Sequence, residues 1–407
     1  MKRALIFTLI FLFLISLTSA EMIFNQQPKE IYNLGDTINI PVTVKTIGTV
    51  TGVLNLELLC NGQVINFYKN GVSLSSGEEK KMETSLILTK EVIGTITGDC
   101  KIKATFGGNY ILSNDFKISN IINLEIKEPK IEFSPGENLI VEGNAVKENG
   151  DAANGFISLE LINQAGGQNI SKAETINRGY FIINTSLPKD MKAGAYSITL
   201  NAYEKDSLEE TTNTGSATYN INIKQIPTNL ELVLENKEVE PGTSLKVKTI
   251  LHDQSGDNIQ SPSIITIKNK KDKIIQQTEI ATDEFLEYKV AYNEAPSEWK
   301  IHAVSNQLSA ESTFKILEKQ YIEVELINRT LTIYNKGNVP YNKTVTEKIK
   351  NESIYIETDL KVDESQKYFL TAPDGEYIVE VLSDGESKMN GQVMLTGKAI
   401  DVKKVSS

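Results

Sequence analysis

The chain has 407 residues, of which 40% are apolar and 23% charged, with a formal net charge of −11. This length corresponds to about four domains of roughly 100 residues, and the composition excludes a disordered chain. The acidic balance disfavours nucleic acid and anionic membrane surfaces as partners, because phosphate binding needs clustered Lys and Arg.

The N-terminus has the pattern of an export signal. Lys2 and Arg3 precede an apolar run over residues 4–17, and small residues follow up to Ala20. We expect cleavage before Glu21, which removes two positive charges and leaves −13. The alternative is an uncleaved N-terminal anchor, since the run approaches the length of a spanning helix. The C-terminal segment 398–407 is polar, and we expect no membrane anchor there.

Short alternating segments separated by Gly, Asn, Asp and Pro fill the rest of the chain and predict β-strands throughout. Turn glycines recur at a period of about 100 residues, which indicates repeated domains. Gly35, Gly136 and Gly242 lie 101 and 106 positions apart, and each precedes an alternating strand. Gly150 and Gly256 follow the second and third of these by 14 positions, so the same two turns bracket the same strand in two copies.

A late strand in each repeat opens on a Pro- or Gly-containing turn and an aromatic or cysteine residue. The opening residues are Cys100, Tyr196, Trp299 and Tyr377, and apolar residues follow at every second position. This period predicts one buried and one solvated face. We expect the three aromatic residues to anchor the core, the alternative being a platform that binds sugar.

The turn-plus-aromatic pattern resembles the late strand of bacterial and archaeal immunoglobulin-like (Ig-like) surface modules. In the last repeat, Leu331–Pro340 and Ala372–Tyr377 resemble the cell-adhesion-related (CARDB-like) Ig domains. The resemblance implies tandem sandwiches that act as stalks, spacers or adhesive units on a prokaryotic, archaeal-like cell surface. The predicted division is a signal peptide at 1–20 and Ig-like domains at 21–127, 128–225, 226–317 and 318–407, each of the first three closing on a final strand (123–127, 219–224 and 313–317).

Cys60 and Cys100 are the only cysteines. Each is in phase with inward-facing apolar residues of its strand, and the chain is expected to be exported, so we predict a buried disulfide in domain 1. Closing this 40-residue separation stabilises by about 4 kcal/mol on the chain-entropy model. The alternative is a pair of buried free thiols.

Catalytic and metal chemistry find little support. The only histidines, His252 and His302, are in phase with lysines and out of phase with the core residues, so we expect both on the surface and on different sheets. Turns around Asp151 and around Asp253–Asp257 could hold calcium, but Asn, Asp and Gly are also what turns require. A glycosidase with two distant carboxylates stays open on sequence alone. We predict no catalytic residue, no cofactor and no metal site.

Five N-glycosylation sequons occur, about as many as chance gives for this composition. They lie at Asn169, Asn184, Asn328, Asn342 and Asn351. The count is therefore no argument for glycosylation, although an exported chain would permit it.

The sequence thus predicts an all-β protein of tandem Ig-like β-sandwiches. We expect a semi-rigid, non-enzymatic, extracellular structural or adhesive rod of the cell envelope, whose partner is an envelope protein or glycan. The alternative function is a carbohydrate- or peptide-binding accessory module of a surface complex, and a secreted hydrolase is a weaker third. An exposed aromatic row on one sheet would favour the binding module.

Overall fold

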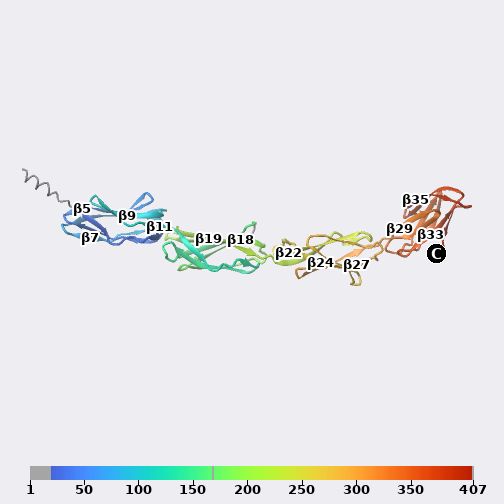
Figure 1. Ribbon diagram of the computed structural model, residues 1–407, viewed down its shortest axis with the longest axis horizontal. Helices are drawn as coiled ribbons and strands as arrows, with labels where there is room; N and C mark the ends of the chain where they lie inside the picture. Colours follow the sequence, from blue (N-terminus) through green and yellow to red (C-terminus); the bar gives the residue numbers. More distant parts are fainter. Residues whose placement is uncertain (1–19, 167–168, 406–407) are drawn as a thin grey trace, which may run out of the picture. The chain divides into compact units, whose positions relative to one another are not determined.

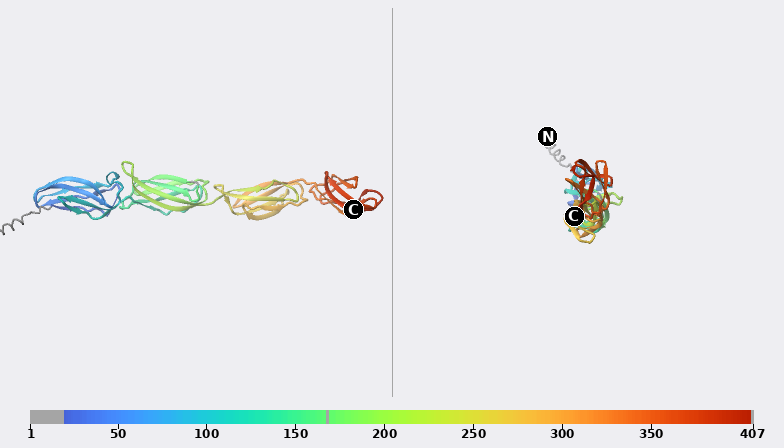
Figure 2. Two further views of the ribbon diagram at one scale, coloured as in Figure 1. Left: turned by 90° about the horizontal axis from the view of Figure 1, so that it is seen from above. Right: turned by 90° about the vertical axis from the view of Figure 1, so that its right-hand side faces the viewer.

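A computed structural model describes residues 20–166 and 169–405. The predicted signal peptide lies outside the described residues except for Ala20. The rest is almost entirely β-structure in two compact units, Met1–Lys224 and Gln225–Ser407. Four separate hydrophobic cores occur, and each is enclosed between sheets (Figures 1 and 2). The predicted all-β fold of tandem Ig-like sandwiches is confirmed.

The strands form where the sequence alternates. In Gly98–Phe106 every second residue from Cys100 to Phe106 is buried, and the residues between them are partly exposed. Gly194–Lys205 repeats this pattern from Tyr196 to Ala202. Because side chains alternate across a strand, each strand contributes one row to the core and one row to the surface.

Domain 1 packs a large mixed sheet against two small ones. The large sheet has the order β2-β11-β9-β5-β6, with β10 paired to β9, and the small sheets are β1-β4-β7 and β3-β8. The elements are β1 (Ala20–Phe24), β2 (Ile31–Asn33), β3 (Thr37–Asn39), β4 (Val42–Thr46), β5 (Val50–Cys60), β6 (Gln63–Leu74), β7 (Glu79–Met82), β8 (Ser85–Ile87), α2 (Lys90–Ile93), β9 (Gly98–Phe106), β10 (Asn109–Leu112) and β11 (Phe116–Ser119). The four-residue helix α2 is the one helix among the described residues, where the sequence predicted none.

Domain 2 has a three-stranded sheet, β12-β14-β17, facing a five-stranded sheet, β13-β19-β18-β15-β16. The strands are β12 (Ile122–Ile126), β13 (Glu132–Phe133), β14 (Asn138–Lys147), β15 (Gly155–Asn163), β16 (Asn169–Ile176), β17 (Tyr180–Ser186), β18 (Gly194–Lys205) and β19 (Thr211–Ile223).

The predicted boundary between domains 1 and 2 is wrong. The segment assigned as the final strand of domain 1 is β12, which pairs along its length with β14, and Ile122 belongs to the core of domain 2. Domain 1 ends instead with β11, at Ser119. Two residues, Asn120 and Ile121, separate the last strand of one domain from the first strand of the next.

Domain 3 repeats the layout of domain 2. Its five-stranded sheet, β21-β28-β27-β24-β25, matches that of domain 2 strand for strand, and β20-β22-β23 with β26 beside β22 forms the facing sheet. The strands are β20 (Pro227–Leu234), β21 (Glu238–Val239), β22 (Ser244–Asp253), β23 (Asn258–Ile259), β24 (Pro262–Lys268), β25 (Ile274–Ala281), β26 (Leu286–Lys289), β27 (Ser297–Ser305) and β28 (Leu308–Ile316).

Domain 4 has two four-stranded sheets, β29-β30-β33-β36 and β32-β31-β34-β35. Its strands are β29 (Ile322–Ile327), β30 (Thr330–Asn335), β31 (Thr344–Ile349), β32 (Glu352–Glu357), β33 (Ser365–Thr371), β34 (Gly375–Ser383), β35 (Glu386–Leu395) and β36 (Asp401–Lys404).

The repeated glycines have the backbone that their turns require. Gly35, Gly136 and Gly242 have φ of 94°, 77° and 86°, and Gly150 and Gly256 have φ of 88° and 84°. Side chains other than glycine rarely adopt these values, which explains why glycine recurs at these points.

Candidate functional site: the interdomain joints

The two histidines do not meet. His252 lies on β22 and His302 on β27, in the two different sheets of domain 3, and both are half-buried on the faces away from the core. The Nε2 atom of His252 lies 3.4 Å from the Glu231 carboxylate. Among the described residues, no three His, Cys, Asp or Glu side chains gather where they could hold a metal ion.

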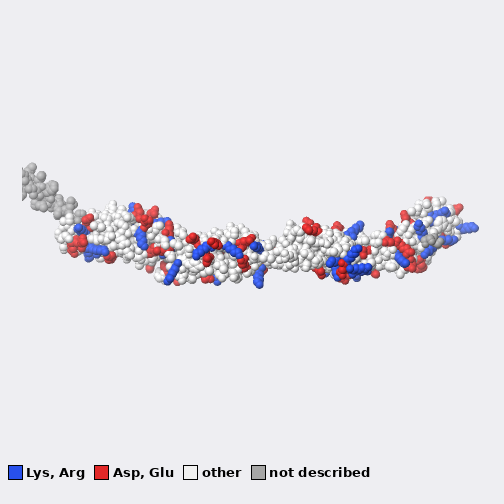
Figure 3. Space-filling model, turned by 60° about the horizontal axis from the view of Figure 1, so that its bottom comes forward, with Lys and Arg blue, Asp and Glu red and all other residues white. Residues whose placement is uncertain are grey.

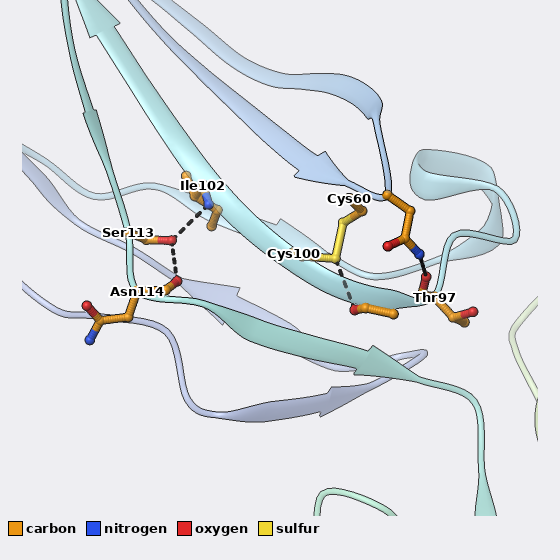
Figure 4. Close-up of a disulfide and its surroundings, with 8 residues drawn as sticks. Cys60, Thr97, Cys100, Ile102, Ser113 and Asn114 are labelled. Atoms are coloured by element: carbon orange, nitrogen blue, oxygen red, sulfur yellow. Dashed lines mark hydrogen bonds between the residues drawn. A yellow bond between two sulfur atoms is a disulfide. The ribbon is translucent and has the colours of Figure 1, made fainter.

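The predicted disulfide is present between Cys60 and Cys100 (Figure 4). The two residues are direct cross-strand partners of β5 and β9, with Cα atoms 4.3 Å apart, so the bond joins neighbouring strands of one sheet. Both are 2% exposed. The bond therefore fastens one end of this strand pair from inside the core.

The three late-strand aromatic residues are core anchors. Tyr196, Trp299 and Tyr377 are 0%, 1% and 5% exposed. Each tyrosine hydroxyl donates to the carbonyl of the residue four positions earlier, at 3.0 Å and 2.9 Å. This is the tyrosine-corner arrangement of Ig-like sandwiches, and it leaves no ring face for a sugar at these positions.

The acidic turn around Asp253 is held by its own hydrogen bonds. The buried Asp253 carboxylate accepts from the backbone N–H groups of Ser255 and Asp257, the Ser255 hydroxyl and the Gln225 side chain. Desolvation raises the pKa of Asp253, but the hydrogen bonds together bring it below its ordinary value. The carboxylate oxygens of Asp253 therefore stabilise the turn and hold Gln225 at the start of domain 3. Asp151, in the other acidic turn that the sequence singled out, is exposed and accepts from the Asn149 side chain.

All five sequon asparagines are exposed: Asn169, Asn184, Asn328, Asn342 and Asn351.

The joint between domains 1 and 2 is built from buried amides. Asn33 on β2 and Asn213 on β19 are both 0% exposed, and the Asn33 Nδ2 atom donates to the Asn213 side chain at 3.1 Å and to the Ile121 carbonyl at 3.1 Å. Asn213 donates in return to the Leu34 carbonyl at 2.8 Å. The side-chain oxygen of Asn33, Oδ1, accepts from the Asn149 backbone N–H at 3.0 Å. Each domain thus satisfies polar groups of the other.

Charged groups surround this joint. Glu148 of domain 2 accepts from Lys117 of domain 1 at 2.6 Å and also from the Ser119 hydroxyl. These two bonds, Lys117 first, hold the pKa of Glu148 below its ordinary value. Lys147 pairs with Asp36 at 3.6 Å.

The joint between domains 3 and 4 uses the same chemistry. Asn338 is 3% exposed and donates to the carbonyls of Glu294 and Leu317 at 2.9 Å and 2.8 Å. Its side-chain oxygen accepts from the Lys319 backbone at 2.7 Å. Nearby, Asp363 accepts from the Tyr292 hydroxyl and from Asn293, and these bonds lower its pKa.

Sequence reasoning missed these asparagines because Asn in a loop or near a strand end has the composition of an ordinary turn. It also missed Glu347 on β31, which is 0% exposed and has no hydrogen-bond partner for either carboxylate oxygen among the described residues. Burial alone raises its pKa from 4.5 to about 7. Glu347 lies in phase with buried Val345 and Ile349, so the alternation itself was the signal.

On the face in view, acidic and basic side chains are interspersed (Figure 3). Several form surface ion pairs, such as Lys101 with Asp115 at 3.1 Å. No helix of the described residues has the length and apolar character needed to cross a membrane.

Comparisons with known proteins do not assign a family. No family model matches the chain, and no curated protein does. Among solved structures, it is similar to a Listeria innocua beta-glucosidase (17% identity, 25% of this chain and 16% of that chain, TM-score 0.21). It is also similar to the native conformation of E. coli alpha-2-macroglobulin (11% identity, 96% of this chain and 29% of that chain, TM-score 0.23). A Salmonella alpha-2-macroglobulin mutant is similar as well (12% identity, 89% of this chain and 32% of that chain, TM-score 0.23). The chain spans less than a third of each of these proteins, and at such TM-scores the likenesses carry no argument about function.

Proposed function

We propose that this protein is an exported, non-enzymatic structural component of the cell envelope, in which Ig-like modules serve as stiff spacers with adhesive surfaces. The buried asparagine joints carry this proposal. Between domains 1 and 2 only two residues separate the strands, and three side chains that are at most 3% exposed hold the two joints.

The physical argument concerns the cost of bending. A flexible array needs exposed polar linkers, whereas bending a joint of this kind would strip partners from buried amides. Each such loss costs about 1–3 kcal/mol. Domains joined in this way move together, which is the property that a spacer needs. The disulfide adds to the case for export, because such bonds persist in oxidising compartments.

The resemblance of the last domain to CARDB-like modules points to the same class of function. In the segment that carries it, Asn335 donates to the carbonyls of Val339 and Leu360, both at 3.0 Å, and accepts from the Gly337 backbone. The motif therefore shapes the loop that presents Asn338 to domain 3. We assign it a structural role at the joint.

Stiffness can be tested in the full mature chain. Spin labels at Lys80→Cys and Asp190→Cys, both exposed, would report the distance between domains 1 and 2 without touching the native disulfide. We expect one narrow distance distribution, which broadens when Asn33 and Asn213 are both replaced by Ala. Asn222→Ala, an exposed asparagine on the same strand as Asn213, is the matched control and should change nothing. A broad distribution in the parent would refute the spacer.

Location is tested separately. The intact mass of the natively produced protein should correspond to a chain that begins at Glu21, or to the full chain if the N-terminal segment is an uncleaved anchor. Protease added to intact cells should degrade the protein. Protection from protease until the cells are lysed would refute the envelope assignment.

A further inference from the structure

The outer face of the five-stranded sheet of domain 2 has an unusual composition. Strands β16, β15, β18 and β19 bring sixteen side chains to this face in four cross-strand rows. The rows are Thr175–Phe156–Tyr203–Thr214, Ala173–Ser158–Asn201–Ser216, Ser171–Glu160–Thr199–Thr218 and Asn169–Ile162–Ser197–Asn220. Eleven of the sixteen are Ser, Thr or Asn, and Glu160 is the single charge. We call this surface the neutral face.

Domain 3 provides the internal reference, because its matching sheet has the same strand order. The four rows that match there carry four charged side chains, against one in domain 2: Lys268, Glu279, Lys300 and Glu311. The matching solvated face of domain 3 is therefore charged, which keeps it soluble and discourages association. The low charge of this face in domain 2, where Glu160 is the single charged side chain of the sixteen, calls for a reason of its own.

One end of the neutral face is aromatic and hollowed. Phe156 and Tyr203 are stacked with ring centroids 5.5 Å apart, and Phe156 is 40% exposed. The register between β18 and β19 shifts between Tyr203 and Lys205, an irregularity of the kind that redirects side chains. A depression of about 550 Å³ lies there, lined by Asn201, Tyr203, Thr211, Thr214, Gly215 and Ser216.

The polar groups of this depression are free to bind. No side-chain hydrogen bond of Asn201, Thr214 or Ser216 occurs within the part of the chain that the structure describes. Hydroxyl and amide groups both donate and accept, which matches neighbouring hydroxyls on a sugar ring. Aromatic rings offer apolar surface to the C–H groups of the same sugar.

From these observations we propose that the neutral face binds an uncharged polysaccharide, with the depression beside Tyr203 as its main subsite. A neutral polyhydroxylated chain has no charge with which to compensate a desolvated Lys or Glu, so charges on its binding surface would oppose binding. An anionic polymer would instead favour complementary basic charges, which this face lacks. Protein interfaces are depleted in Ser, of which this face carries four. The inference stands apart from the proposed spacer function.

The test uses the full mature chain, produced without glycosylation because Asn169 lies on the face. The probes are dextran, starch, glucomannan and chitin, with polygalacturonate and chitosan as charged polymers, in affinity electrophoresis and sedimentation. We expect retention by at least one neutral polymer, changing less than about twofold between 50 and 500 mM NaCl because no ion pairs are involved.

Two variants locate the site. Tyr203→Ala should weaken retention at least about tenfold, as expected when an aromatic anchor is removed. Ser216→Glu, which places a carboxylate in the depression, should weaken it similarly. Ser309→Glu puts the same charge on the matching face of domain 3 and should leave retention unchanged. Thermal midpoints would show that all three variants fold.

Retention by none of the neutral polymers would overturn the proposal. So would retention that Tyr203→Ala and Ser216→Glu leave intact, or binding only to charged polymers that salt abolishes. None of these outcomes affects the distance measurement across the joint, so failure here is distinguishable from failure of the spacer.

Discussion

Replacing Glu347 should stabilise domain 4 at neutral pH, against the usual effect of changing a core residue. Its side chain is 0% exposed between buried Val345 and Ile349, and neither oxygen has a partner among the described residues. The Glu347 carboxylate loses its hydration on folding and gains no hydrogen bond in return, which disfavours its charged form. The pKa rises from 4.5 to about 7, with desolvation as the cause.

The direction and size of this pH-dependent change in stability follow from the linkage between proton binding and folding. A carboxyl whose pKa is raised in the folded state binds its proton more tightly there than in the unfolded chain. Its contribution to stability is therefore fully present below pH 4.5, and it is lost as the pH rises from 4.5 to about 7. A shift of this size corresponds to about 3 kcal/mol. Glu347→Gln keeps the shape but cannot ionise, so the variant should match the parent near pH 4.5 and exceed it by about 3 kcal/mol at pH 8.

The assay must report domain 4 alone. Hydrogen exchange followed by mass spectrometry in rising urea, on the full mature chain at pH 5 and pH 8, gives the opening free energy of peptides from β31 and β34. Glu380→Gln is the matched control, since Glu380 lies on the same sheet, half-exposed, 3.8 Å from Lys348. Fluorescence of Trp299, the only tryptophan, follows domain 3 and should not move. A variant that is destabilised equally at both pH values would refute the reasoning, because it would mean that the carboxylate has a partner in solution.

Three other changes test the contributions of the disulfide, the tyrosine corners and the asparagine joint to stability. Reduction of the Cys60–Cys100 bond should destabilise domain 1 by about 4 kcal/mol, and an unchanged urea midpoint on adding reductant would contradict the chain-entropy argument. Tyr196→Phe should cost about 1 kcal/mol through loss of one buried hydrogen bond, measured by urea unfolding, with Tyr377→Phe expected to behave alike in domain 4. Asn213→Ala should lower the free energy of unfolding of the first unit by about 1–3 kcal/mol and raise hydrogen exchange at the end of β2 next to Leu34. Faster hydrogen exchange in domain 2 alone would show that the joint does not stabilise domain 1.

Local alternation accounts for what the sequence predicted correctly. The strands, the inward positions of Cys60 and Cys100 and the buried late-strand aromatic residues all follow from period two. The boundary at residue 127 failed because alternation does not name a partner strand. Residues 122–126 alternate equally well as the end of one sandwich or the start of the next, and only pairing with β14 decides.

The joints and the neutral face depend on contacts between distant residues. Asn33 and Asn213 are 180 positions apart, and nothing in the sequence around either residue indicates that their side chains meet. The neutral face needs the register of four strands before its sixteen side chains form one surface. Glu347 is different, because a charged residue at an inward position was visible in the alternation itself.

Gly215 connects the joint with the proposed binding surface. It lines the depression on the neutral face, and a Cβ atom at this position would lie 2.0 Å from the Ile122 carbonyl oxygen, where the chain enters domain 2. The neighbouring Thr214 backbone donates to the Asn120 carbonyl at 2.8 Å. The wall of the depression is therefore fastened to the linker between domains, so the joint that stiffens the first unit also fixes the shape of the surface it presents. A substitution at Gly215 would therefore change both the stiffness of the joint and the binding surface. The Ser216 side chain points away from the linker onto the neutral face, so a substitution there changes the binding surface alone.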